Sequence, residues 1–185
     1  MRSHLLNSFT FLIGLLGFKT SAAIASDIFL CDPGGEIVGE SEDPRHSQCL
    51  DVLSWSWGAT KELGLTGGTG RDDVIGDVGD LAFVKWIDKS TPILMQSATK
   101  GKVFPKVEIH NYKSCCDAEY LKITLEQALV TSYQTGGSAG DDRPTESVSL
   151  NFTKIQLCYT YLNTDGKPGS EPECYGWDVE GAASY

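Results

Sequence analysis

Acidic and glycine residues in one loop are the strongest local sign of ligand chemistry in this sequence. The run Gly67–Ile75, GGTGRDDVI, fits the nonapeptide pattern of calcium-binding β-helices, in which glycines allow tight turns and Asp supplies oxygen ligands. Each ion in that mechanism sits between stacked copies of the motif, and only a fragment, GDVGD, follows here. We therefore expect an acidic surface loop, with calcium binding as the alternative.

Residue types that carry catalysis are present, but their spacing does not indicate a catalytic site. The histidines are His4, His46 and His110, which fall in a leader, a polar loop and a predicted strand, where a neutral structural role is expected. No Ser lies in a nucleophile elbow. The acidic pairs Asp72–Asp73 and Asp141–Asp142 flank glycines, so solvated turns explain them better than acid–base catalysis. We predict no catalytic, cofactor or metal residues, and an enzyme would need a site that the sequence does not locate.

The first 25 residues have the composition of a cleaved secretory leader. Leu5–Phe18 is a largely apolar run that is too short to span a membrane, and small residues follow up to Ala25. We predict cleavage between Ala25 and Ser26, which leaves residues 26–185 as a single secreted or periplasmic domain without a stable membrane span. A mis-assigned start or an uncleaved interfacial anchor is the alternative.

The chain is acidic, which bears on its partners. Its formal net charge is −10, and loss of the leader, which removes Arg2 and Lys19 and no acid, brings this to −12. Such a surface repels a phosphate backbone unless a basic patch compensates, and none is visible. Nucleic acid is therefore not an expected partner.

Six cysteines lie downstream of the leader, and an even number in an exported chain favours disulfides. None of their spacings gives the C-x-x-C of a zinc site or a redox motif, so structural crosslinks are expected rather than reactive thiols. The disulfide candidates are Cys31, Cys49, Cys115, Cys116, Cys158 and Cys174.

One pairing follows from geometry. Cys158 and Cys174 are equidistant from Gly166, at the centre of the turn signal NTDG, so a symmetric hairpin would place them opposite each other. Adjacent Cys115 and Cys116 point to opposite faces of an extended chain, so we expect them to bond different partners rather than each other.

Alternating apolar residues predict two long strands within Glu119–Thr160, joined by the polar turn Gly136–Pro144. In the second strand the apolar residues change from even to odd positions. A β-bulge near Thr153 would restore them to one face, and a strand that crosses from one packing layer to another is the alternative.

The rest of the chain also predicts mostly strands. Leu53, Trp55 and Trp57 share one face of a strand and supply aromatic surface for the core or an interface. The Gly-rich stretch Ala59–Gly79 is expected to form a long loop or an extended hairpin. The strands are expected at about 27–31, 49–57, 81–87, 106–112 and 174–179.

A single helix signal interrupts the strands. Ser90 or Thr91 can cap it, Pro92 suits its first turn and Gly101 ends it. Seven or eight strands with one short helix predict a mainly β protein, either a compact barrel or a sandwich.

Five segments, taken together and in this order, carry a resemblance to a known family. They are DVLSWSWG at 51–58, DLAFVKWIDKSTP at 80–92, EYLKITL at 119–125, TGGSAGDDR at 135–143 and YGWD at 175–178. The chain resembles, over about residues 27–180, the Hcp family, the haemolysin-coregulated tube proteins of bacterial type VI secretion systems.

The resemblance implies an Hcp-like compact β-barrel of two antiparallel sheets with one short flanking helix. It also implies homo-hexameric rings that stack into a tube, and as further partners a spike protein, a sheath and cargo effectors. Family members in their basic form are not enzymes. The loop Ala59–Gly79 matches the family's extended loop toward the adjoining ring.

The leader and the six cysteines depart from the family pattern, since members that build the tube are leaderless and poor in cysteine. The two features support each other, because disulfides persist in oxidising compartments. The first hypothesis is an exported, disulfide-stabilised, ring-forming structural protein. The alternative is an exported monomeric binding module of the same fold, in one version binding calcium through Gly67–Ile75.

Overall fold

The long strand β7 (Ala118–Gly136) organises the fold. The structure is a computed structural model that describes residues 27–61, 76–114, 116–140 and 142–185. Within these residues β7 is accompanied by one helix, α1 (Thr91–Lys100). The other strands are β1 (Ile28–Cys31), β2 (Leu50–Ser56), β3 (Ala59–Thr60), β4 (Asp77–Val78), β5 (Leu81–Trp86), β6 (Val103–Lys113), β8 (Thr145–Asn151), β9 (Lys154–Tyr159), β10 (Glu173–Asp178) and β11 (Ala183–Ser184).

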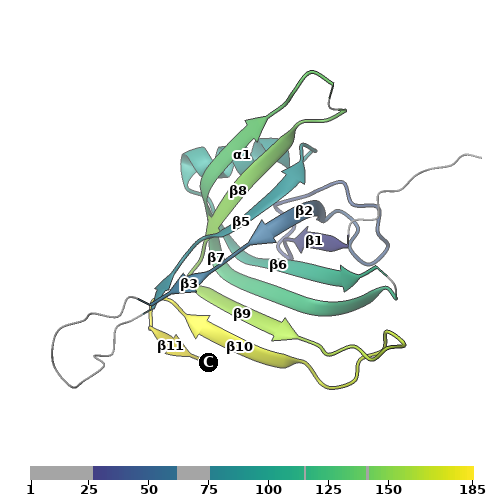
Figure 1. Cartoon of the computed structure of the whole chain (residues 1–185). Coiled ribbons are helices and arrows are strands. Elements are labelled where there is room, and N and C mark those ends of the chain that lie inside the picture. Colours follow the sequence, from purple (N-terminus) through teal and green to yellow (C-terminus); the bar gives the residue numbers. More distant parts are fainter. Residues whose placement is uncertain (1–26, 62–75, 115, 141) are drawn as a thin grey trace, which may run out of the picture.

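Six strands close into an antiparallel barrel (Figure 1). The order is β7, β6, β1, β2, β5 and β8, and β8 pairs back with β7. Closure is possible because β7 has 19 residues and serves two neighbours along one edge: residues 121–126 pair with β9 and residues 129–136 pair with β8. A closed barrel leaves no free strand edge, and the predicted mainly β barrel is confirmed.

Strands β9, β10 and β11 continue from β7 outside the barrel, and we call them the C-terminal extension (Figure 1). β9 pairs with β10 along its whole length, and β10 then pairs with β11. Because β11 is the last strand in the order, the extension has an outer edge that the barrel lacks.

Buried side chains change parity within both strands of the β6–β7 pair, from even to odd positions along β6 and from odd to even along β7. At this point Gln127 has a φ of 52°, a left-handed conformation that is uncommon outside glycine. The register stays continuous from Val103 to Asn111 of β6, so both strands change face together and both halves fill the core. The buried residues are Ile123, Leu125, Ala128 and Val130 in β7, and Phe104, Val107 and Ile109 in β6.

The predicted β-bulge near Thr153 is wrong, because the chain leaves one strand there and starts another. β8 ends at Asn151 between β5 and β7, and β9 begins at Lys154 between β7 and β10. The Thr153 amide donates to the Glu126 carbonyl at 3.0 Å, at the point where β7 changes partner. The chain therefore passes from the barrel to the C-terminal extension at Thr153. This agrees with the alternative expectation, in which the chain crosses from one packing layer to another.

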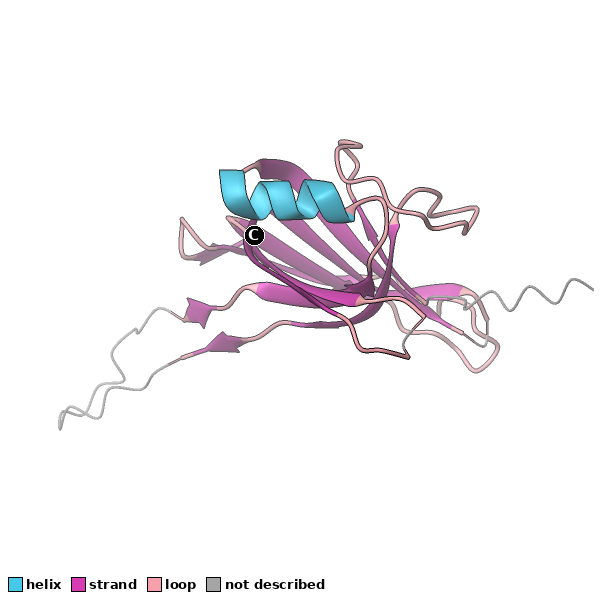
Figure 2. Cartoon of the chain, turned by 90° about the horizontal axis from the view of Figure 1, so that it is seen from above, coloured by secondary structure: helices cyan, strands magenta, loops and turns pink. Residues whose placement is uncertain are grey.

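The helix α1 lies along one flank of the barrel, as Figure 2 shows. It begins after Ser90, has Pro92 in its first turn and ends at Gly101, whose φ of 70° suits glycine, so the predicted helix is confirmed. Leu94 of α1 is fully buried in the barrel core. Burial of one such side chain contributes about 1.5–3 kcal/mol.

The structure corrects the face expected for Leu53 in β2 and shows strand pairing in the stretch that follows β2. One extra residue in β2 between Val52 and Ser54 turns Leu53 outward to 41% exposure, while Trp55 and Trp57 pack against the core. β3 and β4 pair at the base of the extended hairpin predicted within Ala59–Gly79.

Candidate functional site

The first polar cluster surrounds the ammonium group of Lys85, which is completely buried in the barrel wall. Lys85 Nζ of β5 lies 2.7 Å from Asp88 Oδ1 and 2.8 Å from Glu146 Oε1 of β8, and it donates to the Trp86 carbonyl at 2.9 Å. Removal of one partner from such a buried pair costs about 3–5 kcal/mol, because the other charge is left uncompensated. The cluster ties β5 to β8 and to the turn that begins α1.

Two hydroxyl groups complete this network. Ser90 Oγ donates to Asp88 Oδ1 at 2.6 Å, and Tyr133 OH donates to Glu146 Oε2 at 2.8 Å. Burial and the Glu146 carboxylate together raise the pKa of Tyr133 to about 12. These contacts join Lys85, Asp88 and Glu146 to one another and to their neighbouring hydroxyl groups, so the network holds β5, β8 and the start of α1 together.

A second polar cluster forms around two histidines from distant parts of the chain. His46, in the loop between β1 and β2, is buried, and its ring centroid lies 4.7 Å from that of His110 in β6. Phe29 stacks on His46 at 4.6 Å, and His46 Nε2 lies 2.8 Å from Tyr112 OH. The loop between β1 and β2 is thus fixed against β6 by aromatic packing and a hydrogen bond.

Electrostatics distinguish the two rings. His110 Nδ1 lies 2.7 Å from Glu119 Oε1, and His110 Nε2 lies 3.5 Å from Glu108 Oε2. Burial lowers the pKa of His110, but the two carboxylates raise it further, so the net shift is upward. Burial and the nearby His110 lower the pKa of His46. The neutral structural role expected for His110 stays a prediction, and its two carboxylate neighbours are the cause of its raised pKa.

Two disulfides are formed by described residues. Cys158 and Cys174 face each other in the β9–β10 register and are bonded, the pairing predicted from the hairpin. Cys31 and Cys49 form the other and join the end of β1 to the start of β2.

Cys116 is also disulfide-bonded, whereas Cys115 lies outside the described residues. The prediction that this adjacent pair bonds two other cysteines of the chain is wrong, because those four are paired with one another. Its assumption of an extended chain also fails, since Cys116 lies in a turn and Asp117 has a φ of 54°.

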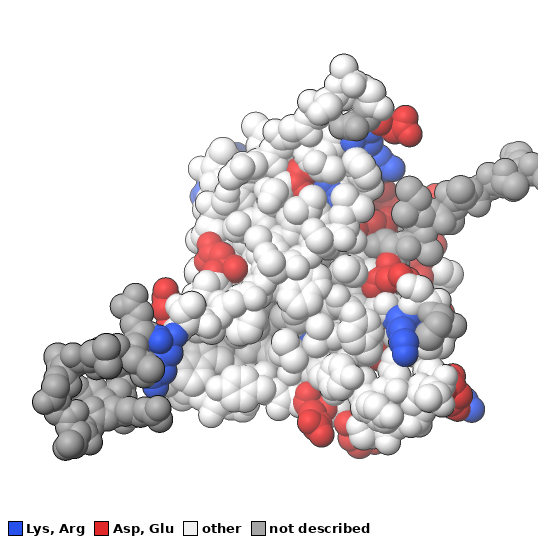
Figure 3. Space-filling view, viewed as in Figure 1, with Lys and Arg blue, Asp and Glu red and all other residues white. Residues whose placement is uncertain are grey.

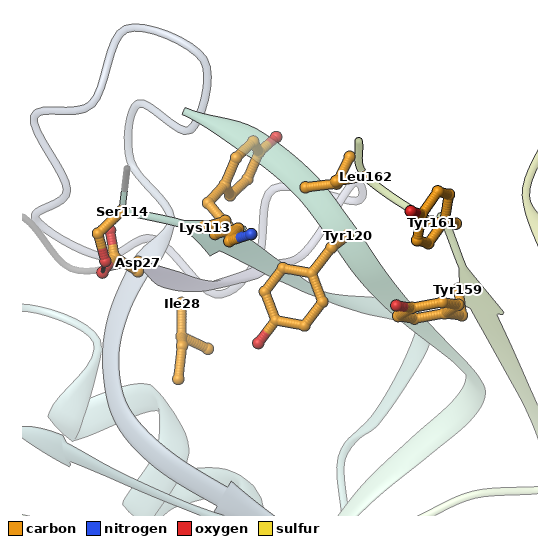
Figure 4. A pocket seen from close by; sticks show the side chains of 9 residues that line it. Asp27, Ile28, Lys113, Ser114, Tyr120, Tyr159, Tyr161 and Leu162 are labelled. Carbon is orange, nitrogen blue, oxygen red and sulfur yellow. Dashed lines mark hydrogen bonds between the residues drawn. The ribbon is translucent and has the colours of Figure 1, made fainter. Parts of the chain in front are cut away.

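A hollow of about 520 Å³ lies where the start of β1 and the joined ends of β6 and β7 meet the chain after β9 (Figure 4). Four tyrosine rings dominate its wall and offer stacking surface, while the side chains of Asp27 and Ser114 are hydrogen-bonded to each other at the rim. The lining residues are Asp27, Ile28, Tyr112, Lys113, Ser114, Tyr120, Tyr159, Tyr161 and Leu162.

Exposed aromatic side chains gather on the C-terminal extension and the chain beside it. Tyr159 and Tyr175 are about half exposed and share one face of the β9–β10 pair, the face opposite the Cys158–Cys174 disulfide. On that disulfide face the Tyr185 ring packs over Gly176, where a Cβ atom would meet it at 2.8 Å. An exposed aromatic face beside a free strand edge is typical of an interaction surface.

Charged residues do not form a basic patch on the face shown in Figure 3. Lys and Arg side chains are scattered among Asp and Glu there, and much of the face carries no charge. Within the described ranges no helix is both long and apolar enough to cross a membrane.

Several predicted residues fall outside the described part of the chain. The cleavage site at Ala25 and Ser26 and the calcium-like run Gly67–Ile75 both lie there. Sequence reasoning did not bring Cys31, His46 and His110 together, yet their potential metal-ligand atoms lie within 4.8 Å of one another. Spacing gave no signal for this cluster, because its members come from β1, a loop and β6.

Comparison with known proteins connects this barrel to one family. A family model described as "Type VI secretion system effector, Hcp" matches residues 29–159. The chain belongs to the Hcp family. The match runs from β1 into β9, so it includes the closed barrel and ends before the second half of the C-terminal extension.

Individual relatives agree with this assignment. The curated "Protein hcp1" of Pseudomonas aeruginosa is 43% identical over 147 residues, which cover 78% of this chain and 91% of that protein. The solved Hcp1 of Salmonella typhimurium is 29% identical with a TM-score of 0.70, and covers 86% of this chain and 98% of its own. A further "type six secretion system protein" has a TM-score of 0.80 at 25% identity, and covers 87% of this chain and all of its own.

Proposed function

We propose that this Hcp-family chain is a ring-forming, non-enzymatic structural protein whose rings stack into a secreted tube. The observation that carries the proposal is the family match over residues 29–159, with 43% identity to Pseudomonas aeruginosa hcp1 across 91% of that protein. The clusters around Lys85 and around His46 and His110 support a non-enzymatic role, because their polar groups bond to one another inside the fold.

The arrangement of strands gives a physical reason for assembly. The barrel is closed, whereas the C-terminal extension has a free edge at β11 and exposes Tyr159 and Tyr175 on one face. A neighbouring copy placed against this extension would cover both features. We propose a homo-hexameric ring as the assembled form, with the spike, the sheath and cargo effectors of the secretion system as its partners.

Export is the second part of the proposal. The leader predicted for residues 1–25 and the Cys31–Cys49 and Cys158–Cys174 bonds fit a protein that matures in an oxidising compartment, either periplasmic or extracellular. Intact-mass analysis of exported protein is expected to give a chain that begins at Ser26. A chain that still carries its leader would contradict this part of the proposal and leave the ring untouched.

Size-exclusion chromatography with light scattering tests the ring over a range of protein concentrations. A chain of residues 26–185 is expected to show six times its monomer mass at high concentration. Tyr175→Ser should weaken assembly, whereas Met95→Ser, at a similarly exposed position on α1, serves as the matched control. A strict monomer would favour the alternative, an exported monomeric binding module. Calorimetry with calcium would then test whether that module binds calcium through Gly67–Ile75.

A further inference from the structure

Four side chains that prefer soft divalent metals converge beneath the loop between β1 and β2. Cys31, His46 and His110 place their ligand atoms within 4.8 Å of one another, and His46 Nδ1 lies 3.6 Å from Cys31 Sγ. Cys49 joins them, because its sulfur is bonded to that of Cys31. Two cysteines and two histidines form a donor set that zinc uses in structural sites.

The spacing of these atoms suits a tetrahedral ion. Zinc holds sulfur at about 2.3 Å and nitrogen at about 2.0–2.1 Å, so neighbouring ligand atoms lie about 3.3–3.8 Å apart. The separation of 3.6 Å between His46 Nδ1 and Cys31 Sγ falls in this range. Ligand atoms of the three-residue group lie at most 4.8 Å apart, so they need a closure of up to about 1 Å, and the sulfurs of Cys31 and Cys49 must separate when their bond is reduced.

Each histidine has a partner that orients its ring for ligation. Tyr112 OH lies against Nε2 of His46, which leaves Nδ1 directed toward Cys31. Glu119 lies 2.7 Å from Nδ1 of His110, whereas Nε2 lies 3.5 Å from Glu108 Oε2, so Nε2 is the more weakly held nitrogen and would exchange Glu108 for the ion. A carboxylate or hydroxyl on the second ring nitrogen is the outer support that metal-binding histidines use.

Charges around the cluster also suit a cation. Glu108 and Glu119 flank His110, and Glu108 is held by Lys122 at 3.0 Å. Arg45, which lies over the Tyr112 ring, is paired with Asp43 and Asp117. The cationic neighbours of the site are therefore already balanced by carboxylates.

We propose that the reduced chain binds one Zn²⁺ through Cys31, His46, Cys49 and His110, and that the Cys31–Cys49 disulfide replaces the ion on oxidation. Both bonds would fasten the same loop, which has little regular structure between β1 and β2. The site would therefore hold the loop before export, in a reducing compartment where the disulfide does not persist.

The exchange is chemically balanced. A dithiol reductant supplies two electrons and two protons to the Cys31–Cys49 bond, and zinc binding then displaces the two thiol protons. In the reverse direction, a disulfide-bearing oxidant accepts two electrons from the two thiolates. The sulfur–sulfur bond re-forms and the ion is released.

Metal titration of a chain of residues 26–185 tests the proposal, because this chain keeps every described residue. Cys115, Cys116, Cys158 and Cys174 are changed to Ser, so that Cys31 and Cys49 are the remaining cysteines. After reduction and removal of metal, Zn²⁺ is titrated against a chromophoric chelator. One ion per chain is expected, and Co²⁺ should give the visible spectrum of a tetrahedral thiolate site.

Matched variants separate this site from adventitious binding. Tyr112→Phe removes an outer partner and should weaken Zn²⁺ binding by roughly 10–100-fold. His46→Ala and His110→Ala each remove a ligand, so each should weaken Zn²⁺ binding by more than that. The oxidised chain should bind no stoichiometric zinc. Full-strength binding in the double His variant, or none by a folded reduced chain, would overturn the proposal.

Loss of structure on reduction gives a second readout of the same claim. If circular dichroism shows that the reduced chain unfolds, added Zn²⁺ is expected to restore the β spectrum, because binding and folding are coupled. Failure of zinc to restore it, or equal recovery in the double His variant, would contradict the proposal. None of these outcomes depends on ring formation, so the proposed function is tested separately.

Discussion

The closed barrel and the C-terminal extension are built from the same strand, β7, but they are stabilised differently. The barrel has a continuous apolar core and the fully buried Lys85 network, so its stability arises within the chain. The extension is held by β9 pairing and by the Cys158–Cys174 bond, and it exposes tyrosines and a free edge. The comparison teaches that the barrel closes on itself, whereas the extension packs Ile155 into the common core and still has surface left for a neighbour.

Loss of the Lys85 ammonium should have the largest effect on the barrel. Lys85→Met leaves Asp88 and Glu146 as buried charges without a cation, so the free energy of unfolding should fall by about 3–5 kcal/mol. Urea unfolding measures this change. Lys167→Met is the matched control, because Lys167 pairs with Asp165 at an exposed site and should change stability by less than about 0.5 kcal/mol. Equal losses of stability in Lys85→Met and Lys167→Met would contradict the difference between the buried and the exposed ion pair.

Loss of the Cys158–Cys174 crosslink should weaken the extension while leaving the barrel strands protected. A disulfide that closes a loop of this length stabilises the folded protein by about 3 kcal/mol. The double Cys→Ser variant should show faster amide hydrogen exchange in β10, with β6 and the second half of β7 unchanged. Uniform acceleration across β6 and β10 would show that barrel and extension open as one unit.

The hydroxyl group of Tyr133 should contribute an intermediate, pH-dependent effect. Tyr133→Phe leaves Glu146 Oε2 without its donor and should cost about 1–3 kcal/mol at neutral pH. In the wild type the folded-state pKa of Tyr133 is raised to about 12 from an ordinary value of 10.0, so the folded state holds this proton more tightly. The contribution is therefore complete below pH 10 and is lost as pH rises from 10 to 12.

Urea unfolding of the wild type and Tyr133→Phe at several pH values measures this contribution. The stability difference between them should shrink across the pH 10–12 interval. A difference that stays constant to pH 12 would contradict the role of the Tyr133 hydroxyl group.

Exposed tyrosines of the extension should have the smallest effect on stability. Tyr159→Ser and Tyr175→Ser remove surface side chains, so monomer stability should change by about 0.5 kcal/mol or less. Assembly measured by light scattering should nevertheless weaken. Unchanged assembly in the double variant would place the ring interface elsewhere on the molecule.

The fold was largely predictable from the sequence, because alternation along the chain and the signals at Pro92 and Gly101 are local. The bulge near Thr153 was mispredicted for a physical reason: a change of apolar parity reports that the chain changes face, but not whether it also changes partner. The sequence predicts an extended chain at Cys115 and Cys116, but the chain turns at Cys116 and Asp117, and no local signal indicates that turn.

The candidate site was much less predictable, since its members converge through tertiary structure. Lys85 occupies a buried position in the alternation of Leu81 and Phe83, and that was the one available signal for its network. His46 and His110 gave none, because the loop that carries His46 has no apolar periodicity. Their meeting depends on how β1 and the loop pack against β6.

The oligomeric mass of the chain of residues 26–185, determined by light scattering across a concentration series, tests the central claim most directly. The account predicts a hexamer at high concentration, formed with both described disulfides intact and weakened by Tyr175→Ser. A monomer at every concentration, with its barrel folded and its disulfides formed, would contradict the claim that this Hcp-family protein forms rings.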